Sequence, residues 1–222
     1  MGTISRVRVG GVCAILMVVS GFVARIVYGN EWLAARGVET FIIGHWFDVL
    51  ALLLAMAAAL GFYQALHKVG AVLWIAVVAI LTGVIFLLFY EFIRLGIGYE
   101  LAPAIADAST ATRPALEVMA NTLRQTGRLA VDVGYVLIFG IGVLLFSFAI
   151  LRTSVVPKWI GRLGLIVVVA NVAEAAISSG VFPITKSYTV WTVAAVTSQL
   201  WLVAMGVVLL RLKEPVAPDS VA

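Results

Sequence analysis

The sequence predicts an all-α integral membrane protein, a bundle of six transmembrane helices with an extra amphipathic outer helix between spans three and four. Of its 222 residues, 63% are hydrophobic and only 12% are charged, whereas a soluble domain is typically ~45–50% apolar and ~25% charged. The mean hydropathy is +1.13. The core of a 222-residue protein cannot bury this amount of apolar surface. A large part of the apolar surface must therefore face lipid.

Six stretches are long enough to span a bilayer, since ~20 mostly apolar residues cross ~30 Å of hydrocarbon. Residues that usually end helices separate them, as at Gly29-Asn30, Pro157 and Pro183. The predicted spans are residues 10–28, 45–66, 70–92, 130–151, 160–179 and 189–210. We therefore expect one transmembrane domain, residues 1–211, followed by a polar cytoplasmic tail, residues 212–222.

The long connection between spans three and four contains a helix signal of its own. Thr112 is placed to cap a helix, and Pro114 stands near its first turn. Apolar residues then recur at helical spacing. They are Leu116, Met119, Ala120 and Leu123. We expect an amphipathic helix that runs into span four and lies over the mouth of the bundle; an interfacial helix that only fills space fits the same pattern.

Lys and Arg residues indicate the orientation, because cytoplasmic loops are enriched in them. The shortest and most basic connection is residues 152–162. A cytoplasmic N-terminus places on the inner side Arg6, Arg8, Lys68, Arg152, Lys158, Arg162, Arg211 and Lys213. Most acids fall on the opposite side. We therefore expect both termini in the cytoplasm.

Polar residues gather at the predicted outer ends of the first four spans. Residues three apart share one face of a helix. The pairs with this spacing are His45 with Asp48, Glu91 with Arg94, and Asp132 with Tyr135. Arg25 ends the first span, and Arg128 lies one turn before Asp132. The residues fit a shared outer pocket, but each also fits an ordinary pair within its own helix.

Glu174 is the carboxylate that the sequence places well inside a span, ~21 Å from the inner end of span five at helical rise. Asn171 lies one turn below it, and Gln199 lies near the middle of span six. A charge near the bilayer centre costs ~2.5–3.5 kcal/mol on insertion scales. Glu174 should therefore face the bundle interior, a cavity or a partner, and we expect function to depend on it most. A carboxyl that only ties helices together is the alternative.

These patterns favour a protein that binds a small amphipathic or lipid-like molecule in an outward-facing polar pocket. The expected ligand-binding residues are Arg25, His45, Asp48, Glu91, Arg94, Asp132, Tyr135, Asn171, Glu174 and Gln199. One alternative is a membrane enzyme in which Glu174 or Asp48 acts as general acid on an isoprenoid or lipid, because apolar surroundings favour a protonated carboxyl. Others are a small transporter, a homo-oligomer and an accessory subunit of a membrane complex.

The sequence offers no motif for a cofactor or a metal. His45 and His67 lie near opposite ends of one span, and a single cysteine, Cys13, excludes a disulfide framework. Gly-rich phosphate loops, HExxH and GxSxG are absent from the sequence. We therefore expect no cofactor, no metal site and no nucleic-acid partner.

One stretch resembles a recurring feature of a bacterial membrane-protein family. Residues 151–164 read Leu-Arg-Thr-Ser-Val-Val-Pro-Lys-Trp-Ile-Gly-Arg-Leu-Gly, and Leu-Leu-Arg closes the last span at residues 209–211. Both are similar to the multi-pass proteins described as domain of unknown function 4386. The resemblance implies six spans in a bacterial cytoplasmic membrane and carries no activity. Physically, Pro157 breaks the helix and Trp159 anchors it at the interface.

Overall fold

The computed structural model of the whole chain describes residues 3–28, 37–178 and 188–212. All regular structure among these residues is helical, and six helical segments are long and apolar enough to cross a membrane. The predicted fold class is therefore confirmed. The expected polar tail, residues 212–222, lies outside the described residues except for Leu212.

Two of the described spans change helical type along their length. The single-helix spans are α1 (Thr3–Tyr28), α2 (Val38–Leu66), α7 (Lys158–Ser178) and α8 (Tyr188–Arg211). The third span comprises α3 (Val72–Gly96), the π-helical turn η2 (Ile97–Leu101) and α4 (Ala102–Asp107). The fourth comprises α5 (Arg113–Tyr135), the π-helical segment η3 (Val136–Val143) and α6 (Leu144–Arg152). A short 3₁₀ helix, η1 (His67–Val69), connects α2 to α3.

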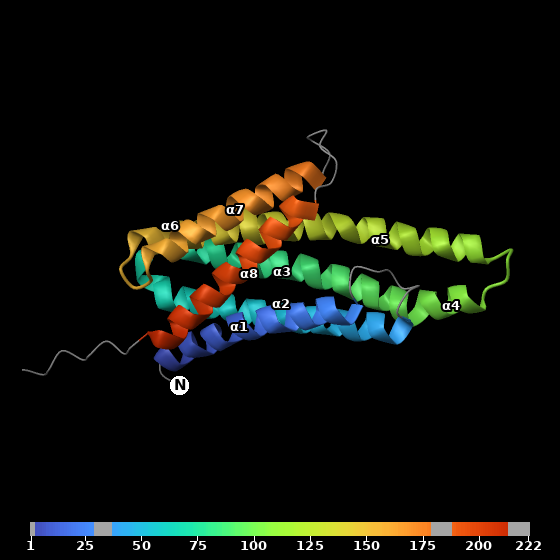
Figure 1. Cartoon of the computed structure of the whole chain (residues 1–222), viewed down its shortest axis with the longest axis horizontal. Helices are drawn as coiled ribbons and strands as arrows, with labels where there is room; N and C mark the ends of the chain where they lie inside the picture. The colour runs from blue at the N-terminus through green and yellow to red at the C-terminus, as the bar shows by residue number, and fades with distance from the viewer. Residues whose placement is uncertain (1–2, 29–36, 179–187, 213–222) are drawn as a thin grey trace, which may run out of the picture.

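The six spans form a closed ring. α1 packs on α2 and α8, α2 packs on α3, and α3 packs on α5 and η3. α7 closes the ring between α6 and α8. Figure 1 shows that α1 begins and α8 ends at one end of the bundle, which we call the terminal end. The opposite end, where α4 and α5 meet, is called the hairpin end.

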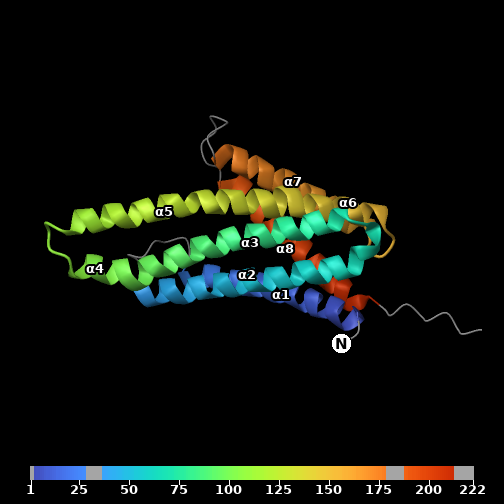
Figure 2. The same cartoon turned by 180° about the vertical axis from the view of Figure 1, so that it is seen from behind.

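α4 and the first part of α5 project beyond the other helices, as Figures 1 and 2 show from opposite sides. The continuous helical stretches cover 36 residues (Val72–Asp107) and 40 residues (Arg113–Arg152). At the helical rise they measure roughly 54 Å and 60 Å, well beyond the ~30 Å of a hydrocarbon core. The predicted amphipathic helix is therefore present and continuous with span four.

This outer helix extends away from the bundle and does not lie over its mouth, contrary to our expectation. Small residues explain the difference, because Ala120, Gly127, Ala130 and Gly134 are the buried positions of α5. Gly127 sits against the ring of Tyr90 on α3. This narrow face keeps α5 packed along the third span, so the two helices continue together as a hairpin.

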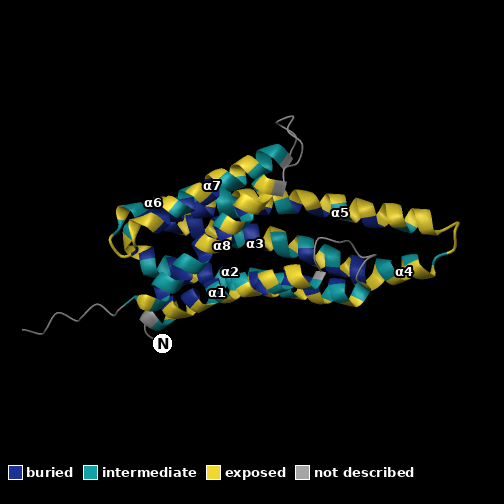
Figure 3. Ribbon diagram, in the orientation of Figure 1, coloured by how far each residue is buried: buried dark blue, intermediate teal, exposed yellow. Residues whose placement is uncertain are grey.

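An apolar core fills the terminal half of the ring. Phe62, Phe146 and Trp201 meet edge to face, with ring centroids 5.9 Å apart for Phe62–Phe146 and 5.7 Å apart for Phe62–Trp201. The Trp201 indole donates a hydrogen bond of 3.2 Å to the carbonyl of Ile160. Figure 3 shows buried positions inside the ring and exposed ones along the projecting hairpin.

The α1–α2 pair crosses at glycine. The backbones of Gly10 and Gly61 touch, and a Cβ on either residue would overlap the Cα of the other. Close backbone approach at small residues is how membrane helices gain packing without a hydrophobic driving force. The crossing sets the tilt of α2, which carries His45 and Asp48 at its other end.

Candidate functional site

A cavity of about 480 Å³ opens at the hairpin end of the ring. Its walls come from α1, α3, α5, η3, α7 and α8. We call it the arginine cavity, because three arginines line it with two carboxylates. The charged lining residues are Arg25, Arg124, Arg128, Asp132 and Glu174. The other polar or aromatic ones are Tyr90, Gln125, Tyr135, Phe139, Asn171, Trp191, Ser198 and Gln199.

Helical spacing explains why α5 supplies so much of the wall. Arg124, Arg128, Asp132 and Tyr135 are four, four and three residues apart, so they lie along one face of the helix. On the opposite wall, the Arg25 guanidinium lies over the ring of Trp191, 4.9 Å from its centroid. This cation–π contact holds Arg25 at the cavity rim.

The cavity floor joins α7 to α8. The Asn171 amide donates to the Ser198 hydroxyl at 3.1 Å and to the Val167 carbonyl at 2.9 Å. Ser198 in turn donates to the Ala194 carbonyl at 2.7 Å. These bonds satisfy the polar side chains at the point where the cavity meets the apolar core. Hydrogen-bonded polar side chains therefore form the floor of the cavity.

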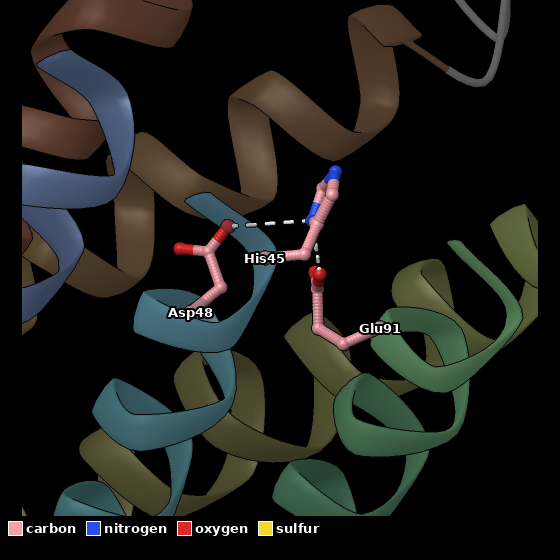
Figure 4. Close-up of side chains that lie close together, drawn as sticks. All are labelled: His45, Asp48 and Glu91. Carbon is pink, nitrogen blue, oxygen red and sulfur yellow. Dashed lines mark hydrogen bonds and ion pairs between the residues drawn. The ribbon is translucent and has the colours of Figure 1, made fainter. Parts of the chain in front are cut away.

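A second polar group, the His45 cluster, lies between α2 and α3. It consists of His45, Asp48 and Glu91. His45 Nδ1 shares a hydrogen bond of 2.6 Å with Glu91 Oε2 and lies 3.9 Å from Asp48 Oδ2, as Figure 4 shows. One donor atom from each residue lies within 4.8 Å of the others. His45 is fully buried, and its ring meets Phe41 edge on, with centroids 4.3 Å apart.

Arg94 lies beside this cluster but does not form the ion pair with Glu91 that the sequence spacing predicted. Its guanidinium lies over the rings of Phe41 and Tyr90, 5.3 Å and 5.4 Å from the centroids. It donates a hydrogen bond of 3.2 Å to the Tyr90 hydroxyl. Among the described residues, no ion pair with an N–O distance within 4 Å joins Arg94 to Glu91. Glu91 instead turns toward α2, where the buried imidazole offers a shorter contact.

Tyr135 stands between the two groups. The charges of Arg25 and Glu174 in the cavity and of Asp48 and Glu91 in the His45 cluster all lie close enough to act on its hydroxyl. Tyr90, another cavity residue, accepts a hydrogen bond of 3.2 Å from Arg94 beside the cluster. Tyr135 is also the last residue of α5, where the backbone changes to the π-helical η3. π-helical turns inside α-helices are frequent at functional sites. The two groups are therefore neighbours.

The structure thus places the predicted site residues in two adjacent groups and not in one. Those at the arginine cavity are Arg25, Asp132, Tyr135, Asn171, Glu174 and Gln199. Those in or beside the His45 cluster are His45, Asp48, Glu91 and Arg94. Of the two carboxyls considered as general acid, Glu174 lines the cavity and Asp48 does not.

One detail differs from the prediction. Glu174 is half-buried and lines the cavity, which is one of the settings expected for it. The buried carboxylate is Glu91, with 9% of its surface exposed. The reason is that α2 packs over Glu91, which hydropathy along a single helix does not reveal.

Sequence reasoning missed several cavity residues, chiefly Arg124, Gln125 and Trp191. Arg124 and Arg128 continue the face of Asp132 and Tyr135 by whole turns, so the helical spacing that selected the latter pair also marks the arginines. Trp191 and Tyr90 carried no comparable signal, because aromatic residues are common at membrane interfaces.

Comparison with known proteins identifies the family without supplying an activity. No curated protein matches the chain. No solved structure matches it either. The family model described as domain of unknown function (DUF4386) matches residues 9–210, which include most or all of each of the six spans. The chain is therefore a member of the DUF4386 family.

Proposed function

We propose that this protein binds a small amphipathic or lipid-like molecule with an anionic head group in the arginine cavity. The observation that carries the proposal is a cavity of about 480 Å³ lined by three arginines. Ligand pockets usually measure ~300–1,000 Å³. The cavity therefore has room for a head group and part of a chain.

The cavity lining offers contacts for both the anionic head group and the apolar chain of such a molecule. Arginine presents a planar fork of donors that matches carboxylate and phosphate groups in bidentate fashion. Arg124 and Arg128 offer this chemistry from α5, and Arg25 offers it from α1. Trp191 and Phe139 offer apolar contact area. Asp132 and Glu174 add acceptors that can orient the guanidinium groups or a hydroxyl of the ligand.

The proposed setting is a bacterial cytoplasmic membrane, with both termini in the cytoplasm and the cavity facing outward. Among the described residues, the basic side chains expected inside lie at the terminal end of the bundle, including Lys68 after α2, Arg152 at the end of α6 and Lys158 at the start of α7. A basic inner end is what the distribution of Lys and Arg in membrane proteins favours. The apolar core lies between that end and the cavity, which supports a binding pocket that faces one side.

Ligand extraction from the purified full chain tests the proposal. We expect wild-type protein in mild detergent to retain an anionic amphiphile detectable by mass spectrometry. Arg128→Gln should lower its occupancy at least about tenfold, because a hydrogen bond to a charged group contributes about 1.5–3 kcal/mol. Arg113→Gln is the matched control, since Arg113 is exposed, forms an ion pair with Glu117 at 3.7 Å and does not line the cavity. Equal loss in both variants, or no retained amphiphile in the wild type, contradicts the proposal.

Glu174 provides a second arm of the same experiment. Glu174→Gln keeps the shape of the side chain and removes its charge, so we expect a monodisperse protein that retains less ligand. If Glu174→Gln retains as much ligand as the wild type while Glu174→Leu aggregates, the residue holds helices together and does not serve the ligand.

A further inference from the structure

The His45 cluster contains the donor set of a metal centre. It brings one imidazole nitrogen and two carboxylate oxygens together from two helices, all within 4.8 Å. Imidazole and carboxylate are the usual nitrogen and oxygen ligands of Zn²⁺ and of neighbouring first-row ions. The cluster lies outside the lining of the arginine cavity, so the proposed ligand does not account for it.

We propose that His45, Asp48 and Glu91 bind one divalent transition-metal ion, and Zn²⁺ is the ion that this donor set fits best. Zinc sites with three protein ligands leave a fourth position to water or substrate. A dication bound directly by both carboxylates balances their charges at the site itself, whereas Arg94 lies beside the cluster and forms no ion pair with Glu91 among the described residues. Charge balance is what permits carboxylates at a buried position such as Glu91.

The distances require only a small rearrangement. Tetrahedral Zn²⁺ with bonds of ~2.0–2.1 Å holds its ligand atoms about 3.3 Å apart. His45 Nδ1 lies 2.6 Å from Glu91 Oε2 and 3.9 Å from Asp48 Oδ2, so the first contact must lengthen and the second shorten, each by less than about 1 Å. The carboxylate oxygens of Asp48 and Glu91 lie within 4.8 Å of each other, and ligation of one ion also requires them to reach the tetrahedral spacing.

The exposure of the three side chains and the packing of His45 are also compatible with a bound metal ion. The Asp48 side chain is 21% exposed, while those of Glu91 and His45 are 11% and 0% exposed. The ion therefore has an entry on the Asp48 side and a fixed imidazole behind it. Phe41 packs against the imidazole and holds its plane, as a rigid ligand requires.

Metal titration of the full chain tests this inference. The protein is purified in detergent with a histidine-free affinity tag, stripped with a chelator and titrated with Zn²⁺ by calorimetry, and metal content is measured after dialysis. We expect one Zn²⁺ per wild-type chain. His45→Gln and Glu91→Gln should each weaken binding at least about tenfold. The matched controls are His67→Gln, an exposed histidine beside the other end of α2, and Glu39→Gln, an exposed acid on α2.

The wild-type titration decides the matter even if a variant fails to fold. Substoichiometric Zn²⁺ binding by wild-type protein overturns the proposal and leaves an ordinary hydrogen-bonded pair. The proposal is equally overturned if His67→Gln loses as much affinity as His45→Gln. Asp48→Asn, at the most exposed ligand, should also weaken binding, and Co²⁺ in place of Zn²⁺ should show visible absorption bands that change in this variant. Retention of the amphiphile in the arginine cavity is read separately, so failure of one proposal does not imply failure of the other.

Discussion

At the scale of the residue, His45 organises the region between α2 and α3. A fully buried imidazole needs a partner for its polar atoms, because an unsatisfied buried donor costs more than a typical hydrogen bond contributes. Glu91 supplies that partner from the neighbouring helix at 2.6 Å. The contact links two spans near the hairpin end, where α2 and α3 diverge from the apolar core. A second hydrogen bond between the same two spans, from the Trp46 indole to the Tyr99 hydroxyl at 3.1 Å, lies nearer the surface.

Removing the Glu91 carboxylate should destabilise the protein. Glu91→Leu takes away the partner of a buried imidazole, at a cost of about 1–3 kcal/mol, so the melting temperature in detergent should fall by roughly 2–10 °C. Glu91→Gln keeps an acceptor oxygen and should melt closer to the wild type. Glu117→Leu, at an exposed acid on the hairpin, is the control. A Glu91→Leu protein that melts with the wild type would show that the bond contributes nothing to stability.

The same residues show which contacts could be predicted from the sequence and which could not. Spacing along α2 predicted that His45 and Asp48 share a face, and their atoms lie 3.9 Å apart. Spacing along α3 predicted Arg94 as the neighbour of Glu91, yet Glu91 bonds to His45. Contacts within a helix follow from a fixed period of 3.6 residues. Contacts between helices depend on rotation and register, which an almost uniformly apolar sequence does not encode visibly.

At the scale of the element, hydropathy was enough to count the six spans and locate their centres, although α2 begins at Val38 and not at residue 45. Each apolar run had to cross the hydrocarbon as a helix, because backbone groups have no other partners there. The same rule said nothing about where α5 goes once it leaves the membrane. Its direction depends on small residues such as Gly127, which packs against Tyr90. Helix pairing in this bundle is therefore set by glycine, and the α1–α2 crossing is the clearest instance.

Gly61→Ala should separate α1 from α2. The new Cβ would overlap Gly10, and because both contacting atoms belong to backbone, the helices must move apart. We expect a lower melting temperature and a weaker α1–α2 contact, the latter read as reduced disulfide cross-linking between cysteines introduced on the two helices. Gly21→Ala is the matched control, since a Cβ there meets nothing within 4 Å. It should leave stability unchanged or raise it by up to about 1 kcal/mol, the helix propensity gained. Equal melting of the two variants would show that the crossing tolerates a wider spacing.

At the scale of the whole molecule, the ring is divided along its axis. The terminal half is filled by aromatic and aliphatic side chains around Phe62, Phe146 and Trp201. The hairpin half encloses the arginine cavity and the His45 cluster. Polar groups at one end and a packed core at the other suit a protein that receives a molecule from one side of a membrane. Which side that is depends on the orientation of the bundle.

Cysteine labelling in intact cells determines the orientation. Cys13, the only natural cysteine, is first replaced by alanine, and single cysteines are placed at Thr110 in the hairpin tip and at Lys158 at the start of α7. Both positions are exposed, so a difference in labelling reports the side of the membrane and not burial.

Because the short connection 152–162 at the terminal end is rich in Lys and Arg and such loops favour the cytoplasm, a membrane-impermeant maleimide should label Thr110→Cys in intact cells. It should label Lys158→Cys only after the membrane is opened. Labelling of Lys158→Cys in intact cells would invert the orientation, and the arginine cavity would then receive its ligand from the cytoplasm.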